Sequence, residues 1–212
     1  NQRTQEAQAL LDSTLRDDPT NALAHEIMGF LPFREGDIHS AKKWYGEAVP
    51  LDSHSFLAHY YYAAMSLPSG DDDHDEAIES SLRAAIKLNP AFAPSYDALA
   101  SFYARRHQNL SEAHLLNVQA VMLEPENLRY RINAAEVLVQ QQQFPGALSV
   151  LKLAATVAKT PDQSAMVQSR IAQIQRLEAA FDRATRNGEN ATSLQTNPTQ
   201  AELAHQCRER KR

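Results

Sequence analysis

The side chains that most often catalyse reactions or bind metals form no recognisable pattern in this sequence. Eight histidines are scattered over 212 residues, and the single cysteine, Cys207, cannot form an internal disulfide. The sequence contains no glycine-rich phosphate loop, no HExxH pair and no GxSxG turn. We therefore expect no catalytic residues, no metal site and no cofactor.

One acidic run, DDDHD at residues 71–75, could attract a cation. A calcium loop needs alternating ligands, a glycine turn and a distal bidentate glutamate, and this run lacks that pattern. We interpret it as a solvated turn whose last residues cap the helix that follows.

Arginines and aromatic residues are stronger candidates, for binding rather than catalysis. Arg105 is followed by Arg106, and Arg129 lies close to Arg131 in the sequence. A guanidinium can hold a carboxylate through two parallel hydrogen bonds, and aromatic residues beside arginine are typical binding anchors. A run of three tyrosines starting at Tyr60 faces several directions of a helix, so at least one ring should be exposed. The alternative is that the arginines are ordinary solvated charges.

The elements that would position these side chains are clearest at residues 93–125. Apolar residues at three- and four-residue steps predict two amphipathic helices, at 94–106 and 109–123. Asn109 and Glu112 have the spacing of a capping box at the start of the second helix. A proline stops that helix.

The same pattern repeats along the chain. A small residue recurs in each first helix, 34, 37 and 35 residues apart, at Gly29, Ala63, Ala100 and Ala135. A second small residue recurs in each second helix, 37, 35 and 34 residues apart, at Ala48, Ala85, Ala120 and Ala154. Helix ends recur at Pro19, Ser53, Pro90 and Pro125. Small residues are needed where packed helices approach closely.

This period and these columns resemble the tetratricopeptide repeat (TPR) family over about residues 4–185. The resemblance implies an all-α, right-handed solenoid of antiparallel helix pairs. The array comprises an unpaired helix at 4–17, repeats at about 22–53, 56–90, 93–125 and 128–158, and a capping helix at 161–185. Residues 186–212 have the composition of a polar linker with a short basic tail.

Three local features give further expectations. Pro32 lies inside the first helix of the first repeat, which predicts a kink or an early stop there. Thr160 and Gln163 have capping-box spacing at the start of the last helix. His25 and His59 occupy a column that is aromatic in the family and holds Tyr96 in the third repeat, so we expect both histidines to pack rather than to bind ligands.

In TPR arrays the first helices line a concave surface that receives a segment of a partner. The resemblance carries this role to one set of positions in the present chain. These are Glu26, Phe30, Phe33, Tyr60, Ala64, Asp97, Ser101, Arg105, Arg129, Ile132 and Glu136. The set is aromatic toward the N-terminal end and charged toward the C-terminal end.

The composition limits the classes of partner that the chain can bind. A net charge of −5 argues against binding of nucleic acid by the whole surface. No stretch approaches the roughly 20 apolar residues of a membrane span. The unpaired helix at 4–17 lacks the helix that would precede it in a repeat, so we expect a fragment of a longer, bacterial protein. A cytoplasmic location is favoured, with the periplasm as the alternative if a signal peptide has been removed.

The sequence therefore favours a non-catalytic module that binds a peptide or protein segment in a groove. A second hypothesis is an accessory or scaffolding domain of a larger enzyme, such as a hydrolase or peptidase, with catalysis outside this fragment. A third is self-association through an exposed apolar face of the helix at 4–17.

Overall fold

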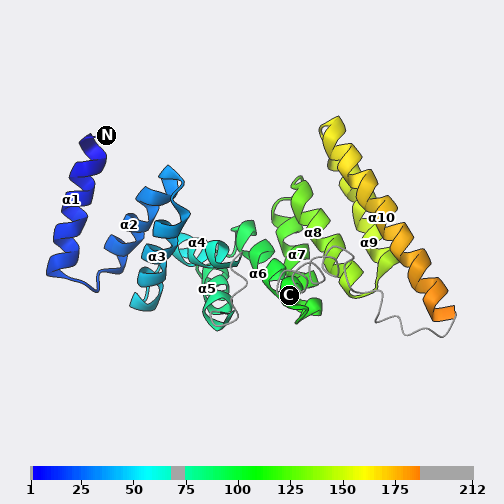
Figure 1. Ribbon diagram of the computed structural model, residues 1–212, viewed down its shortest axis with the longest axis horizontal. Coiled ribbons are helices and arrows are strands. Elements are labelled where there is room, and N and C mark those ends of the chain that lie inside the picture. Colours follow the sequence, from blue (N-terminus) through cyan, green and yellow to red (C-terminus); the bar gives the residue numbers. More distant parts are fainter. Residues whose placement is uncertain (1, 68–74, 187–212) are drawn as a thin grey trace, which may run out of the picture. The chain divides into compact units, whose positions relative to one another are not determined.

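Figure 1 shows a computed structural model of the chain, which describes residues 2–67 and 75–186. Within these residues every regular element is a helix. The elements are α1 (Gln2–Asp17), α2 (Ala22–Glu35), α3 (Ile38–Ala48), the short 3-10 helix η1 (Val49–Leu51), α4 (Phe56–Ser66), α5 (Asp75–Leu88), α6 (Ala93–Arg106), α7 (Leu110–Leu123), α8 (Leu128–Gln140), α9 (Phe144–Val157) and α10 (Pro161–Arg186).

Consecutive helices pack as hairpins. The pairs are α2 with α3, α4 with α5, α6 with α7, and α8 with α9. Helix α1 packs on α2, and α10 packs on α9. The predicted all-α array of helix pairs is therefore confirmed.

The two columns of small residues lie where helices touch. All three alanines of the first column and all four of the second are buried. At Gly29 an added Cβ would lie 3.1 Å from the ring of Tyr45. The spacing of small residues along the chain thus follows from close approach between helices.

Two predicted helix ends differ in the structure. Asn109 has a left-handed backbone (φ 46°) and its side chain forms no capping hydrogen bond, while Glu112 pairs with Arg83 at 2.9 Å. The capping-box prediction at Asn109 was therefore wrong. Helix α2 runs past Pro32 to Glu35, so the early stop was wrong, while the alternative, a kink at Pro32, stays a prediction. Pro32 falls in the last turn, where its carbonyl accepts the N–H of Asp37 at 2.9 Å.

Helix α10 begins at the predicted cap. The N–H of Gln163 donates to Thr160 Oγ1 at 3.2 Å, and Gln163 Oε1 accepts the N–H of Lys159 at 2.7 Å. Val167 and Ile174 of α10 are buried in a core that includes residues of α8 and α9. Its opposite face is exposed at the predicted positions, which are Gln168, Ser169, Arg176 and Arg183.

The chain divides into two compact units, Asn1–Pro125 (unit 1) and Glu126–Arg212 (unit 2). The repeat boundaries drawn from the sequence remain a prediction. The acidic turn at 71–74 and the polar and basic stretch at 187–212 lie outside the described residues. In the part of the chain that the structure describes, no helix combines the length and apolar character needed to cross a membrane.

Candidate binding surfaces

Unit 2 contains a cleft between α8 and α10. The Asn127 side chain accepts the N–H of Arg129 at 3.2 Å and starts α8. Helical spacing then places Arg129, Ile132 and Glu136 on one face of α8. On α10, Gln163, Met166 and Arg170 have the same spacing. These six side chains line a cleft of about 710 Å³.

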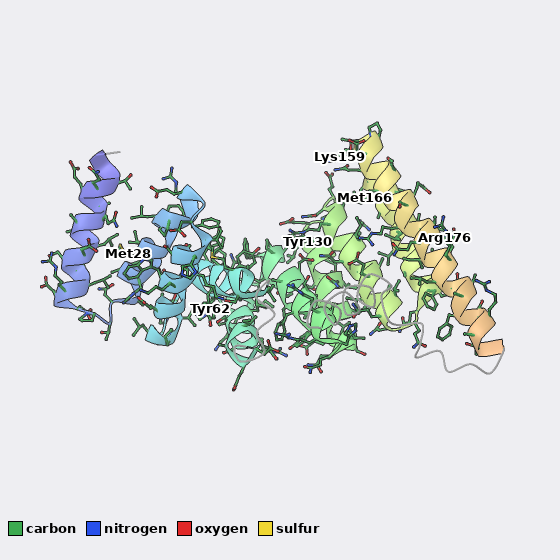
Figure 2. All side chains as sticks on the ribbon, viewed as in Figure 1. Met28, Tyr62, Tyr130, Lys159, Met166 and Arg176 are labelled. Carbon is green, nitrogen blue, oxygen red and sulfur yellow. The ribbon has the colours of Figure 1, made fainter. Side chains whose placement is uncertain are left out.

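The cleft has an apolar part and a charged rim. Leu128 and Ile132 are buried, whereas Met166 is 45% exposed and lines the same space as Val157. Figure 2 shows Lys159 and Met166 near the start of α10, with Arg176 farther along that helix. An apolar floor with a few polar groups around it is typical of ligand sites.

Two ion pairs join the walls of this cleft. Lys159 Nζ lies 2.7 Å from Glu126 Oε2, and Arg170 Nη2 lies 3.2 Å from Glu136 Oε1. The Lys159 hydrogen bond and charge hold the pKa of Glu126 below its ordinary value. All four side chains are exposed, so these pairs contribute little stability and can exchange partners readily.

In unit 1 the predicted surface residues of α2 and α4 join an aromatic cluster. The Phe33 ring lies 4.5 Å from that of Tyr61, and the Tyr60 ring lies 5.1 Å from that of Phe92, edge to face. Phe56 contacts Phe92 at 5.0 Å. The rings of Phe33 and Tyr60 are half-buried, so each presents part of its surface to solvent.

The other predicted residues of unit 1 have different surroundings. Phe30 is exposed and Glu26 is half-buried. Asp97 is buried, while Ala64 and Ser101 are half-buried. Arg105 is exposed. Its neighbour Arg106, a sequence candidate for binding a partner's carboxylate, forms an ion pair with Asp75 of α5 instead.

The histidine column is structural. His25 Nε2 lies 2.9 Å from the carbonyl oxygen of Pro19, and His59 Nε2 lies 3.0 Å from that of Ser53. Tyr96 donates its hydroxyl to the carbonyl of Pro90 at 3.0 Å. Each ring thus bonds to the carbonyl six residues earlier, and both histidines are buried. The predicted packing role is confirmed.

No group of three or more His, Cys, Asp or Glu side chains within the described ranges is arranged to hold a metal ion. Glu79, Arg83 and Tyr103 form a polar cluster in unit 1. Tyr103 donates to Glu79 at 2.6 Å, and Arg83 donates to both. Burial, followed by the bond to Glu79, raises the pKa of Tyr103 to about 12. This cluster joins α5 to α6, and Arg83 also pairs with Glu112 of α7 at 2.9 Å.

Several surface residues were missed by the sequence reasoning. On α10 these are Gln163, Met166 and Arg170, and on α2 they are Leu23 and Ile27. The three α10 residues are three, four and seven apart in the sequence, and Leu23 and Ile27 are four apart. The repeat pattern, however, gives groove positions only within the repeats and assigns α10 only a covering role.

Comparison with known proteins gives no match to a protein-family model and none to a curated protein. Solved structures do match. YrrB, described as a TPR protein with an unusual peptide-binding site, has a TM-score of 0.66 and 16% identity, over 79% of this chain and 86% of YrrB.

MamA from Desulfovibrio magneticus RS-1 has a TM-score of 0.59 and 21% identity, over 74% of this chain and 87% of that one. The type III secretion translocator chaperone SycD of Yersinia enterocolitica has a TM-score of 0.51 and 22% identity, over 61% of this chain and 92% of SycD. These likenesses show the fold, which is the TPR array of helix pairs predicted from the sequence. Its right-handed twist remains a prediction.

Proposed function

We propose that the chain is a non-catalytic TPR module that binds a segment of a protein partner. The observation that carries this proposal is the cleft between α8 and α10. It brings together three positions predicted from the sequence, Arg129, Ile132 and Glu136, and adds a second wall from α10. A partner's apolar side chain would occupy the space beside Met166, and its charged groups would exchange with the rim pairs.

The TPR neighbours support the same class of function. One of them is described as having a peptide-binding site and another as a chaperone. In this chain the cleft offers the features of a peptide site, namely partly exposed apolar side chains beside arginines. Burial of Met166 would supply affinity, and Arg129 and Arg170 would supply selectivity for acidic groups.

The test is a selection of displayed random peptides on the immobilised full chain. Enriched peptides are synthesised with a fluorescent label, and their affinities are measured by fluorescence anisotropy. We expect Met166→Asp and Arg129→Glu each to weaken binding by about tenfold or more, as is usual for the central residues of an interface. The matched control is Arg176→Glu, which changes an exposed arginine on the outer face of α10.

The proposal fails if no peptide is enriched. It also fails if peptides bind the Met166→Asp and Arg129→Glu chains as well as they bind wild type. Circular dichroism of every variant separates lost binding from lost helix.

A further inference from the structure

Helix α2 of unit 1 exposes a stripe of large apolar side chains. Leu23 is 63% exposed, Ile27 39% and Phe30 46%. Their spacing of four and three residues puts them on one face over two turns. The opposite face of α2, including Ala24, Met28 and Gly29, is buried against the rest of the unit. Helix α2 is therefore apolar on both its packed and its open sides.

The stripe differs from the open face of α5, whereas α7 of the same unit exposes a comparable row at Leu115, Val118 and Met122. Helix α5 exposes mainly charged and polar side chains, which are Glu76, Ser80, Arg83 and Lys87. Single exposed apolar residues are normal, but a contiguous row on an otherwise polar surface marks an interaction surface. A row with this spacing matches the way an amphipathic helix presents its anchors.

An acidic recess adjoins one end of the stripe. Leu23, Glu26 and Asp52 line it together with Ala22, His54 and Ser55, and its volume is about 370 Å³. The buried Ser53 donates its hydroxyl to Glu26 Oε1 at 2.5 Å and accepts the N–H of Ser55 at 3.1 Å. The Glu26 carboxylate is thereby held in a fixed position.

Within residues 2–67 and 75–186, neither carboxylate of the recess has a cationic partner. Among the described residues, no Lys, Arg or His nitrogen forms an ion pair with Glu26 or Asp52. At the other end of the stripe the Arg34 guanidinium lies 5.9 Å from the centre of the Phe30 ring. The stripe thus has the Glu26 and Asp52 carboxylates near Leu23 and the Arg34 guanidinium near Phe30.

We infer that this surface binds an amphipathic helical segment of a protein partner, with a Lys or Arg placed in the recess. The segment's apolar side chains, spaced three or four residues apart, pack on Leu23, Ile27 and Phe30. Its basic side chain extends beyond Leu23 and pairs with Glu26 and Asp52. Charge complementarity fixes the direction of the segment along α2. The inference rests on the proposed role of the array in binding protein segments.

The test repeats the peptide selection with the full chain carrying Met166→Asp, so that the cleft of unit 2 is impaired. We expect the enriched peptides to be helical, with a Lys or Arg one turn from a row of apolar residues. Their affinity should fall about tenfold in a chain that also carries Glu26→Gln and Asp52→Asn, because the charge is lost while the Ser53 hydrogen bond is kept. Leu23→Ser with Ile27→Ser should abolish binding. Glu76→Gln, which changes an exposed acid on α5, is the matched control.

Three results would overturn the inference. The first is that no peptide is enriched on the Met166→Asp chain. The second is that the enriched peptides bind the chain carrying Glu26→Gln and Asp52→Asn with unchanged affinity. The third is that replacing the peptides' Lys and Arg by Glu leaves their affinity unchanged. If wild type still selects peptides that depend on Arg129 and Met166, the proposed function stands while this inference falls.

Discussion

A hydrogen bond from a ring to the carbonyl six residues earlier recurs at His25, His59 and Tyr96. The bond ties the start of a first helix to the connection before it. Replacing His59 by Phe keeps the ring but leaves the Ser53 carbonyl without this donor. We expect His59→Phe to lower the free energy of unfolding by about 1 kcal/mol.

His59→Tyr is the matched variant, because Tyr96 makes the same bond through its hydroxyl. It should retain most of the stability that His59→Phe loses. Urea unfolding followed by circular dichroism measures both. Equal losses in the two variants would show that ring shape, not the hydrogen bond, matters at this position.

Asn117 is an amide in a column of core residues that otherwise holds Tyr and Leu. Tyr45, Leu82 and Leu151 occupy the equivalent places three residues before the second small column, and all four side chains are buried. Neither polar atom of the Asn117 side chain has a hydrogen-bond partner within the described chain. Because an unsatisfied buried polar group costs about 1–3 kcal/mol, Asn117→Leu should raise the free energy of unfolding by that order.

The reverse change, Leu82→Asn, should lower stability by at least as much, since it creates the same defect in a column that lacks it. Both variants are measured by thermal and urea unfolding. A loss of stability in Asn117→Leu would mean that the amide makes an interaction that a leucine cannot replace.

Glu79 gives the chain a pH dependence. The Tyr103 hydroxyl, then the Arg83 guanidinium, hold the pKa of Glu79 below its ordinary value of 4.5. A lowered folded-state pKa contributes stability that is complete above pH 4.5 and is lost as the pH falls through the folded value. Glu79→Gln should therefore flatten the acid side of the stability profile, and Tyr103→Phe should flatten it in part. Urea unfolding across this pH range tests this, and parallel profiles for all three chains would refute it.

At the scale of the helix, replacing two glycines by alanine should have opposite effects on stability. At Gly146 of α9 an added Cβ would meet nothing closer than 3.6 Å, so Gly146→Ala should gain about 0.5–1 kcal/mol from helix propensity. At Gly29 of α2 the new methyl would lie 3.1 Å from the Tyr45 ring, which is buried and stacked on Tyr61. Gly29→Ala should lose stability despite the same gain in propensity. Thermal unfolding measures the stability of both variants. A Gly29→Ala chain more stable than wild type would show that the Tyr45 ring can move.

The helices were predictable from the sequence because their core faces repeat. Buried alanines and large apolar residues recur at a fixed period, and that period locates each helix. Helix ends were less predictable, because they depend on single backbone angles. Asn109 adopts a left-handed φ of 46°, which turns its side chain away from capping, and its residue type alone does not reveal this.

The candidate surfaces were predictable only in part. The repeat pattern located Arg129, Ile132 and Glu136 on α8, because they occupy a fixed place within the repeat. It could not locate Met166 or Arg170, because α10 is not a copy of any earlier helix. Which of its faces meets α8 depends on how Val167 and Ile174 pack into the core.

At the scale of the whole molecule, the division at Pro125 predicts how the chain unfolds. In a repeat array each helix contacts only its neighbours, so stability is a sum of local terms. The single tryptophan, Trp44, lies in unit 1 and packs against the core cluster of Leu11, Ala24 and Met28. Its fluorescence therefore reports the unfolding of unit 1, whereas circular dichroism reports all helices.

Leu151→Ala should separate the two signals. Leu151 is buried in the core of unit 2, and removing such a side chain costs about 2–5 kcal/mol. We expect the circular dichroism transition to begin at lower urea, while the Trp44 transition keeps its wild-type midpoint. Leu82→Ala in unit 1 is the matched control and should shift the Trp44 transition directly. If Leu151→Ala moves both signals together, the chain unfolds as one cooperative body, because local destabilisation of unit 2 is then transmitted through the whole array.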